Sequence, residues 1–291
     1  MSTTALKMDQ QLQNRARILV KCPDKPGIVS VLSSFLHAHN ANIIESNQYS
    51  SDPEDGMFFI RIEFHCDDLV MKRSKMEDEF KQIAAQHNMT YSFHYKAIRQ
   101  RAAIYVSKET HCLMELLWEW QNGDLDMDIA VVISNSDVAR PMVEALGIPY
   151  YYIPANKDIR EQVEAEQIRL MEEFNVDLLI LARYMQILSP SFVEMYENKI
   201  INIHHSFLPA FMGARPYERA FARGVKLIGA TSHYVTDDLD EGPIIEQDIM
   251  RVNHQDNVQQ LKKIGQSIER NVLSKAVKWH LQDRIIVQGN K

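Results

Sequence analysis

The chain has 291 residues, of which 45% are hydrophobic and 24% are charged, and its formal net charge at pH 7 is −7. This composition is typical of a globular protein long enough for one large or two ordinary domains, and the acidic balance argues against nucleic acid as a partner. The three cysteines, Cys22, Cys66 and Cys112, include no Cys-x-x-Cys pair, so the sequence indicates neither a disulfide framework nor a zinc site. Residues 1–14 lack the apolar core of a signal peptide, and no apolar run approaches the roughly 20 residues of a membrane span. We therefore expect a cytoplasmic protein with no membrane partner.

The first part of the chain, residues 15–99, has the pattern β-α-β-β-α-β. Apolar residues alternate from Ile18 to Cys22, which indicates a strand, and apolar residues at helical spacing follow from Ile28 to His39. The same signals predict further strands near 42–50, 58–64 and 91–95, and a second helix from Met76 to His87. This order is that of a ferredoxin-like split βαβ unit. Open sheets of this kind commonly pair with another copy, so we expect a homo-oligomer, either a dimer or a tetramer.

The pattern changes near Arg99–Arg101, which we interpret as a linker between domains 1–99 and 100–291. Beyond it, predicted strands alternate with predicted helices, so we expect an α/β fold with a doubly wound, mostly parallel sheet. The strands are expected at 102–106, 128–134, 150–153, 177–182 and 200–204, and the helices at about 109–121, 137–146, 159–174 and 190–198. A hairpin-like pair is expected at 226–235 and 243–252. The last helix is predicted to start near Asp256, with Gln259 bonding back as in a capping box.

Polar residues that can do chemistry lie at the end of the strand 200–204. Asn202 and His204 are two residues apart and therefore emerge on one face, while Ile201 and Ile203 occupy the other. An amide and an imidazole placed in this way can converge on one polarised oxygen. Taken alone, the pair can equally be a strand end with a hydrogen-bonded core histidine. Ligands of parallel sheets do, however, bind beyond the carboxyl ends of the strands, where this pair lies.

The surrounding motifs carry a family resemblance. The run Asn202-Ile-His204-His205-Ser-Phe-Leu-Pro, followed by Thr231 to Gly242, resembles the formyltetrahydrofolate-dependent formyltransferase superfamily, and the doubled histidine is most similar to its formyltetrahydrofolate deformylases. The resemblance covers residues 15–285. It implies a hydrolase of one-carbon and purine metabolism that converts 10-formyltetrahydrofolate and water to tetrahydrofolate and formate, with folate as substrate and no further cofactor.

The same resemblance implies roles for individual residues. Asn202, His204 and Asp240 match the catalytic positions, and either Asp240 or His204 takes the proton of the attacking water. Other matched or neighbouring positions are expected to contact the substrate: Tyr184, Met185, Gln186, Ile187 and Leu188 of a folate-clamping loop, together with His205, His233, Asp238 and Gly242. Each has a plainer interpretation as core packing, a structural histidine or a solvated loop residue. The doubled histidine does not indicate a metal site, because neighbouring strand residues face opposite ways and no spaced His/Cys array supplies further ligands.

The turn between the first strand and the first helix resembles that of ACT domains, which often bind small amino acids and dimerise. Its residues Asp24, Pro26, Gly27 and Ile28 precede a helix N-terminus that can receive a carboxylate. A plain structural turn, in which the glycine supplies an unusual backbone conformation, is the alternative. Domain 1–99 is accordingly expected to be regulatory, with a small amino acid as effector, and domain 100–291 to be catalytic.

One departure from the superfamily concerns the acceptor. Glycinamide ribonucleotide transformylases have a glycine-rich phosphate-binding turn after the first strand of this domain, whereas this chain has Val106-Ser-Lys-Glu-Thr-His-Cys112 without glycine. A phosphate is poorly provided for, so water is the expected acceptor. The alternatives are a transferase that passes the formyl group to an amine, including an initiator tRNA, and a non-catalytic folate or amino-acid sensor.

Overall fold

The computed structural model describes residues 12–52, 55–155, 159–209 and 216–291. The chain forms two compact units, Met1–Arg99 and Gln100–Lys291. Most of the N-terminal segment that lacks a signal-peptide pattern lies outside the described residues.

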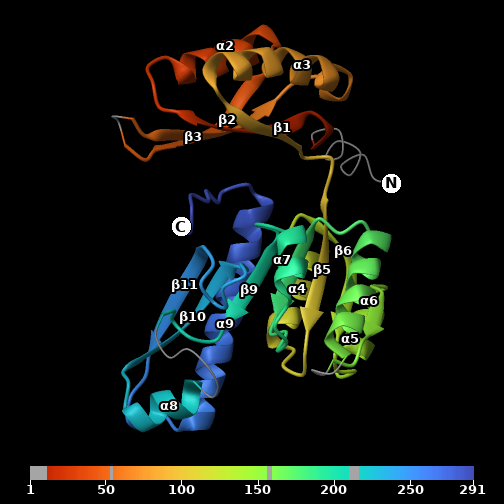
Figure 1. Cartoon of the computed structure of the whole chain (residues 1–291), viewed down its shortest axis with the longest axis vertical. Coiled ribbons are helices and arrows are strands. Elements are labelled where there is room, and N and C mark those ends of the chain that lie inside the picture. Colours follow the sequence, from red (N-terminus) through yellow and green to blue (C-terminus); the bar gives the residue numbers. More distant parts are fainter. Residues whose placement is uncertain (1–11, 53–54, 156–158, 210–215) are drawn as a thin grey trace. The chain divides into compact units, whose positions relative to one another are not determined.

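The first unit is a four-stranded antiparallel sheet with two helices on one face (Figure 1). Its elements are β1 (Arg15–Pro23), α2 (Ile28–Ala38), β2 (Asn42–Ser50), β3 (Met57–His65), α3 (Leu69–His87) and β4 (Thr90–Tyr95). The strand order β2-β3-β1-β4 places the first strand inside the sheet, as in ferredoxin-like folds. The predicted architecture of this part of the chain is confirmed.

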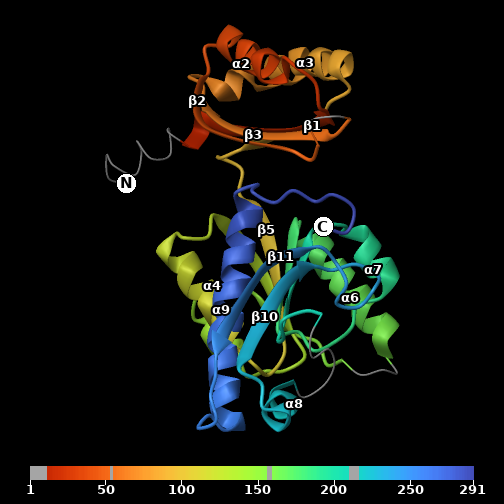
Figure 2. The ribbon, with the colours of Figure 1, turned by 90° about the vertical axis from the view of Figure 1, so that its left-hand side faces the viewer.

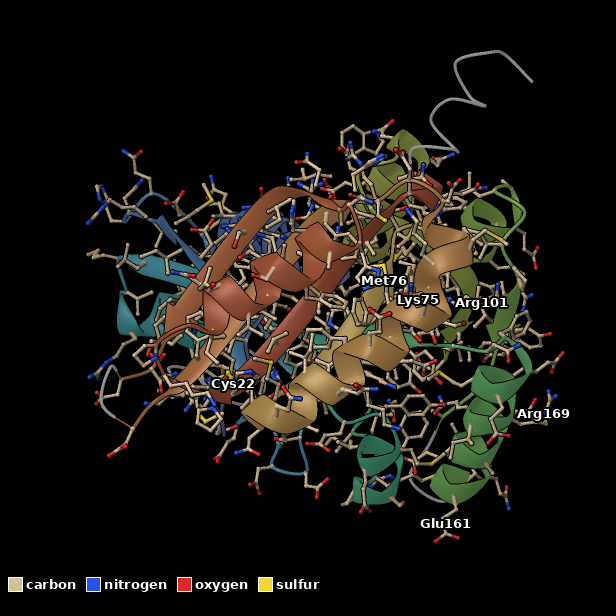
Figure 3. The ribbon with its side chains drawn as sticks, turned by 90° about the horizontal axis from the view of Figure 1, so that it is seen from above. Cys22, Lys75, Met76, Arg101, Glu161 and Arg169 are labelled. Atoms are coloured by element: carbon tan, nitrogen blue, oxygen red, sulfur yellow. The ribbon has the colours of Figure 1, made fainter. Side chains whose placement is uncertain are left out.

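The core of the first unit forms where the apolar face of the sheet packs against the apolar faces of the two helices. Every second residue of β1 and β3, such as Ile18 and Ile62, points to the helical face. On each helix, apolar residues three or four positions apart point back at the sheet. Leu32 on α2 and Phe80 on α3 are examples. Viewed from above, α2 and α3 lie together over the sheet, with the buried Met76 on α3 (Figure 3).

The second unit is built on a seven-stranded sheet of order β11-β10-β9-β8-β5-β6-β7. Neighbouring strands from β9 to β7 run parallel, while β10 pairs antiparallel with both β9 and β11. The strands are β5 (Gln100–Val106), β6 (Met127–Ser134), β7 (Tyr150–Tyr152), β8 (Leu178–Ala182), β9 (Ile200–His204), β10 (Leu227–Tyr234) and β11 (Ile244–Arg251). The helices are α4 (His111–Asn122), α5 (Arg140–Glu144), α6 (Arg160–Glu173), α7 (Pro190–Met195), α8 (Pro216–Arg223) and α9 (Val258–Leu281). This is the expected doubly wound α/β fold.

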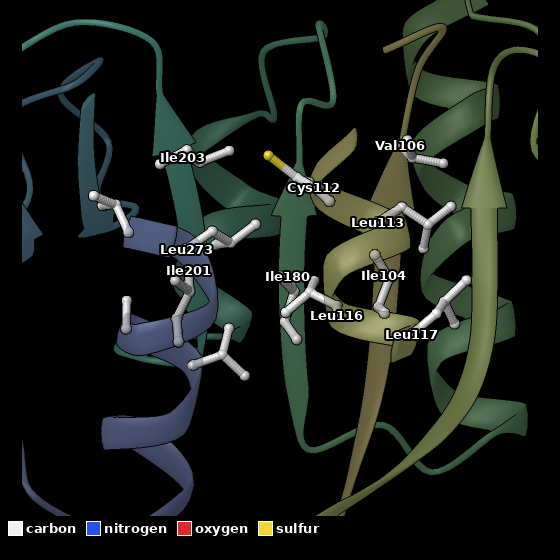
Figure 4. Close-up of a cluster of buried hydrophobic side chains, with 14 of the residues drawn as sticks. Ile104, Val106, Cys112, Leu113, Leu116, Leu117, Ile180, Ile201, Ile203 and Leu273 are labelled. Carbon is white, nitrogen blue, oxygen red and sulfur yellow. The ribbon is translucent and has the colours of Figure 1, made fainter. Parts of the chain in front are cut away.

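Helices cover both faces of this sheet, with α4 and α9 on one side and α6 and α7 on the other (Figure 2). Alternate residues of each buried strand feed two separate cores. Ile104, Ile180 and Ile201 pack toward α4 and α9 in the cluster drawn in Figure 4, whereas Tyr105 and Leu181 pack toward α6 and α7. Burial on both faces explains why these strands are almost continuously apolar in sequence.

The strand order contains a reversal between β5 and β8. From β5 the chain moves outward to β6 and β7, then returns to β8 on the other side and continues to β9. At such a point the connections leave the sheet in opposite directions, which opens a crevice beyond the carboxyl ends of the two strands. The carboxyl end of β9, which carries Asn202 and His204, is one strand away.

Two details of the second unit differ from the sequence predictions. Helix α8 was not predicted: it has only eight residues, PYERAFAR, and these are mostly polar, although its apolar residues Tyr217 and Ala220 are buried. The capping box of α9 consists of Asn257 and Gln260, and the prediction that used Asp256 and Gln259 is wrong by one residue. The physical reason is that the Asp256 carboxylate accepts a hydrogen bond from the Asn253 amide, 2.8 Å away, and so closes the preceding turn.

Among the described residues, no helix is both long enough and apolar enough to span a bilayer. The structure contains one chain, so the expected oligomer stays a prediction.

The shifted capping box can be tested by mutation. Asn257 Oδ1 accepts from the Gln260 amide at 3.0 Å, and Gln260 Oε1 accepts from the Asn257 amide at 2.7 Å. Asn257→Ala should therefore cost about 1 kcal/mol, which corresponds to a decrease of roughly 2–4 °C in the Tm of a unit of this size. Calorimetry or circular dichroism measures the shift. The exposed Gln259 is the matched control, and Gln259→Ala should change stability by less than about 0.5 kcal/mol. A larger loss for Gln259→Ala than for Asn257→Ala would contradict the assignment.

Candidate active site

The candidate site is assembled where β9 pairs with β10. Ile201 and Ile203 of β9 lie in the core beneath α9, so Asn202 and His204 point to the opposite face, as expected from the alternation. Antiparallel pairing sets His233 of β10 directly opposite Asn202. Residues directly opposite on neighbouring strands have their side chains within reach of one another. The sheet register therefore brings together two residues that are 31 positions apart in sequence.

His204 is held by Asp240, which comes from the loop between β10 and β11. His204 Nδ1 lies 3.2 Å from Asp240 Oδ2, and the two side chains are only 9% and 16% exposed. The backbone of Asp240 has φ 60°, a left-handed conformation that aspartate tolerates better than most residues. The Nε2 atom of His204 is buried and has no hydrogen-bond partner among the described residues. With a carboxylate on Nδ1, the ring is oriented so that Nε2 is the atom left for chemistry.

The carboxylate of Asp240 is a weak base in this position. Burial disfavours its charge, but contacts with His204 and His233 outweigh that penalty and hold the pKa of Asp240 well below its usual range. His233 Nε2 lies 3.7 Å from Asp240 Oδ1, farther than the 3.2 Å between His204 and Asp240. Asp240 is therefore suited to orient an imidazole and to stabilise its protonated form.

The amide of Asn202 is oriented by His233. His233 Nδ1 lies 2.8 Å from the Tyr234 carbonyl oxygen, which can only accept, so Nδ1 carries a hydrogen. In the neutral ring Nε2 is then an acceptor, and it lies 3.2 Å from Asn202 Nδ2. One N–H of Asn202 is thereby used, and its second N–H remains available to donate elsewhere. His233 belongs to the site as a positioning residue for Asn202.

The loop that leaves β9 is braced by the strand beside it. The Thr231 hydroxyl donates to the Ser206 carbonyl at 2.9 Å and accepts from the Leu208 amide at 3.0 Å. Gln247 of β11 also bonds to Thr231 and to the Leu208 carbonyl. Thr231 begins the second half of the family motif, and its contacts explain how the two halves of the motif are joined.

His205 faces a different environment from His204. The two rings are 5.1 Å apart between centroids, and His205 also lies 6.3 Å from the ring of Tyr217. Burial, together with the nearby charge of Arg183, lowers the pKa of His205 to about 4. His205 is therefore neutral near pH 7 and can accept a hydrogen bond.

The remaining residues of the acidic loop have distinct roles. Gly242 is required by space, because a Cβ atom at this position would lie 1.9 Å from the Tyr234 carbonyl oxygen. Asp238 is exposed, and its backbone oxygen accepts hydrogen bonds from Thr236 and Glu241. In the described structure Gly242 and Asp238 thus shape the loop that carries Asp240.

The predicted folate-clamping loop lines a cavity of about 490 Å³. The residues 184–188 form one wall, and Ala155, Arg160, Val163, Glu164 and Gln167 form the other. Tyr184 and Leu188 are buried, whereas Met185 and Ile187 are 56% and 61% exposed. The loop is tied to the end of β5, because the Met185 amide donates to Ser107 Oγ at 3.1 Å.

A second buried group of polar residues surrounds Glu269, and it was not predicted from the sequence. Glu269 of α9 is 1% exposed, and it contacts His111, Arg183 and Tyr217. A glutamate in the apolar stripe of a long helix was the signal in the sequence that could have revealed it. His111, Cys112 and Glu269 bring ligand atoms within 4.8 Å of one another, as in a metal site. They fit a metal poorly, because Arg183 already supplies a positive charge and burial raises the pKa of the Cys112 thiol well above its usual range.

The predicted effector residues of the first unit lie around the start of α2. Gly27 has φ 95° and precedes the helix, and the Asp24 carboxylate accepts a hydrogen bond from the Ser50 hydroxyl at the end of β2. Pro26 is exposed, whereas the side chain of Ile28 is buried in the core. Only the backbone of Ile28 can therefore face a ligand at this helix end.

Comparison with known proteins gives a match for each of the two units of the chain. The Formyl transferase family model matches residues 100–277, and the ACT domain model matches residues 16–70. Formyltetrahydrofolate deformylase of Bacillus subtilis (strain 168) is 61% identical over 279 residues, which are 96% of this chain and 93% of that protein. The deformylase of Escherichia coli (strain K12) is 39% identical over 270 residues, which are 93% of this chain and 94% of that protein.

Solved structures give the same result. A formyltetrahydrofolate deformylase from Pseudomonas syringae pv. tomato superimposes with a TM-score of 0.91 at 44% identity, covering 95% of this chain and 93% of that one. Glycinamide ribonucleotide transformylase 1 from Symbiobacterium toebii has a TM-score of 0.62 at 28% identity, covering 66% of this chain and 92% of that one.

The ionised Asp240 should make stability depend on pH. Because its pKa is depressed in the folded state, the stabilisation is complete above the ordinary aspartate pKa of about 4 and is lost as the pH falls through the lower folded value. Asp240→Asn should therefore lower the free energy of unfolding at pH 7, and the difference from the wild type should shrink below about pH 4. Urea titrations at both pH values measure it. Asp237→Asn removes an exposed charge from the same loop and should show little difference at either pH. A difference for Asp240→Asn that does not change with pH would refute the assignment.

Proposed function

The chain belongs to the formyltetrahydrofolate deformylase family, and we propose that it hydrolyses 10-formyltetrahydrofolate with Asn202, His204 and Asp240 at the reacting centre. The observation that carries this assignment is the state of His204. Its Nδ1 lies against an ionised carboxylate, and its buried Nε2 is unpartnered among the described residues. This is the arrangement that a general base needs before substrate binds.

His204 rather than Asp240 removes the proton of the attacking water. The pKa of Asp240 is held well below its usual range by its histidine contacts, so its carboxylate has little affinity for a proton. Both of its oxygens also face histidines, at 3.2 Å and 3.7 Å. Asp240 instead stabilises the imidazolium that forms when His204 accepts the proton.

Asn202 stabilises the charge that develops on the formyl oxygen. Its second N–H is free while the first is directed at His233, so the donor is already oriented when the tetrahedral intermediate forms. A preorganised donor costs no reorganisation at that moment, which makes this kind of stabilisation effective.

The remaining step is the departure of N10. The new C–O bond forms as the water proton passes to His204, and the C–N10 bond breaks as the imidazolium returns a proton to N10. The products are formate and tetrahydrofolate, and no cofactor is required beyond the folate substrate. The cavity beside residues 184–188 has Met185, Ile187 and Leu188 in its lining, and apolar walls of this kind suit the pteridine ring.

Removal of the Asn202 amide tests this mechanism. Asn202→Ala should lower kcat by about 10²–10³-fold, the usual loss for one oxyanion donor, and should change KM little. Formate release from 10-formyltetrahydrofolate is the measurement. Gln259→Ala, which removes an exposed amide from α9, is the control and should behave as the wild type. Near-normal turnover of Asn202→Ala would return this residue to a structural role.

The first unit has a separate function as a sensor. The ACT domain match suggests an amino-acid effector, and the start of α2 supports a site for its carboxylate. Gly27 leaves open space there, since a Cβ atom at this position would meet nothing within 4 Å. Glycine and methionine are the first ligands to test, because both report on the supply of one-carbon groups.

The sensor is tested on the full-length chain. Glycine or methionine should change the apparent affinity for 10-formyltetrahydrofolate by about 5–150-fold, the usual range of allosteric coupling. Gly27→Val should weaken the response, because the side chain occupies the carboxylate position and opposes the left-handed backbone. Gly289→Val is the control, since Gly289 has φ 58° and open surroundings near the C-terminus. No response of the wild type to either amino acid would leave the first unit without a sensing role.

A further inference from the structure

Buried polar side chains meet at the reversal point of the sheet. In open α/β sheets the ligand usually binds between the two strands where the order reverses, here β5 and β8. The segment after β5 contributes His111 at the start of α4, and the residue that follows β8 is Arg183. Both side chains turn toward Glu269 of α9.

These contacts engage both oxygens of the Glu269 carboxylate. His111 Nε2 lies 2.8 Å from Oε2, and Arg183 Nε lies 3.3 Å from the same oxygen. The Tyr217 hydroxyl donates to Oε1 at 2.5 Å. Burial disfavours the charge of Glu269, but His111, Arg183 and Tyr217 outweigh it and hold the pKa of Glu269 below its usual range. The result is an ion-paired cluster whose carboxylate is already bound within the protein.

The backbone and the packing around the cluster hold its residues in fixed positions. We call the cluster of His111, Arg183, Tyr217 and Glu269 the plug. Arg183 has φ 64°, a left-handed backbone conformation that residues other than glycine keep only when the surroundings require it. Tyr217 lies against Gly265 of α9, where a Cβ atom would come within 2.0 Å of the Tyr217 hydroxyl. One helix thus supplies both the gap for the ring and, four residues later, the acceptor for its hydroxyl.

Tyr217 connects the plug to the reacting centre. Its ring lies 6.3 Å from that of His205, which in turn lies 5.1 Å from His204. An aromatic ring that is hydrogen-bonded to Glu269 therefore lies beside His205, the direct neighbour of the histidine that activates the nucleophile. His205, next to it, is neutral near pH 7 and can accept a hydrogen bond from water.

We propose that the cluster of His111, Arg183, Tyr217 and Glu269 is a specificity device that closes the acceptor side of the site, so that water reaches the formyl carbon and an amine does not. The inference deepens the proposed hydrolysis and rests on it. In a protein without the plug, a primary amine can take the place of water. The amine nitrogen then bonds to the formyl carbon as the C–N10 bond breaks, and the amine proton passes through His204 to N10. Tetrahydrofolate is released in both cases, but the second product is a formamide instead of formate.

The test is a competition between water and glycinamide, a small primary amine. 10-Formyltetrahydrofolate is incubated with enzyme and millimolar glycinamide, and formate and N-formylglycinamide are quantified by mass spectrometry against an enzyme-free background. The wild type should form formate alone above background. Tyr217→Ala should raise the ratio of formamide to formate by about tenfold or more, the lower end of what pocket shape usually discriminates. Tyr217→Phe keeps the ring but loses the hydrogen bond to Glu269, so its ratio should lie between those of the wild type and Tyr217→Ala.

Each outcome decides between alternatives. An unchanged ratio for a folded Tyr217→Ala, or formamide formation by the wild type, would overturn the proposal. If Tyr217→Ala does not fold, His111→Ala decides instead, because it removes a contact of Glu269 from a side chain that is 13% exposed and should change the ratio in the same direction. Wild-type enzyme that releases no formate at all would refute the proposed hydrolysis, which is a different result from a wrong assignment of the plug.

Discussion

The antiparallel pairing of β10 with β9 is the constraint on which the site depends. In a parallel sheet, ligand-binding side chains lie at the carboxyl ends of the strands. If the neighbour of β9 were also parallel, its chain would leave the sheet at that end in the same direction as β9. Here the neighbouring strand runs the other way, so His233 stands opposite Asn202 and the loop beyond β10 returns Asp240 to His204. The left-handed backbone of Asp240 and the close approach at Gly242 both serve that return.

Two buried carboxylates with different neighbours organise the second unit. Asp240 and Glu269 are each ionised and each faces a histidine, but the consequences differ. Asp240 occupies one nitrogen of His204 and leaves the other free, which creates a reactive atom. Glu269 is held on both oxygens by His111, Arg183 and Tyr217, which creates a rigid partition. The same interaction, a carboxylate against an imidazole, thus activates one group and immobilises another.

The two adjacent histidines, His204 and His205, face the groups of residues around these two carboxylates. His204 contacts Asp240, while His205 contacts Tyr217, which belongs to the Glu269 cluster. Burial and the charge of Arg183 keep His205 neutral near pH 7. The motif therefore joins the proposed proton-transfer pair, His204 and Asp240, to the proposed acceptor-limiting cluster around Glu269, and a proline or alanine in place of His205 would lose that connection.

The sequence by itself determined both folds, most of their elements and the strand that carries the candidate site residues. Alternation and helical spacing gave both folds, because burial on one face or on both leaves a direct record in the apolar pattern. Alternation also put Asn202 and His204 on one face, and motif resemblance identified Asp240. The start of α9 was misplaced by one residue, because Asp256 and Asn257 are equally good caps in sequence and only the turn at Asn253 distinguishes them. Tertiary structure alone decided the partners of His233, the neutrality of His205 and the Glu269 cluster. Those contacts join residues up to 158 positions apart through sheet register and helix packing, and no local pattern in the sequence records which distant side chain a buried charge will meet.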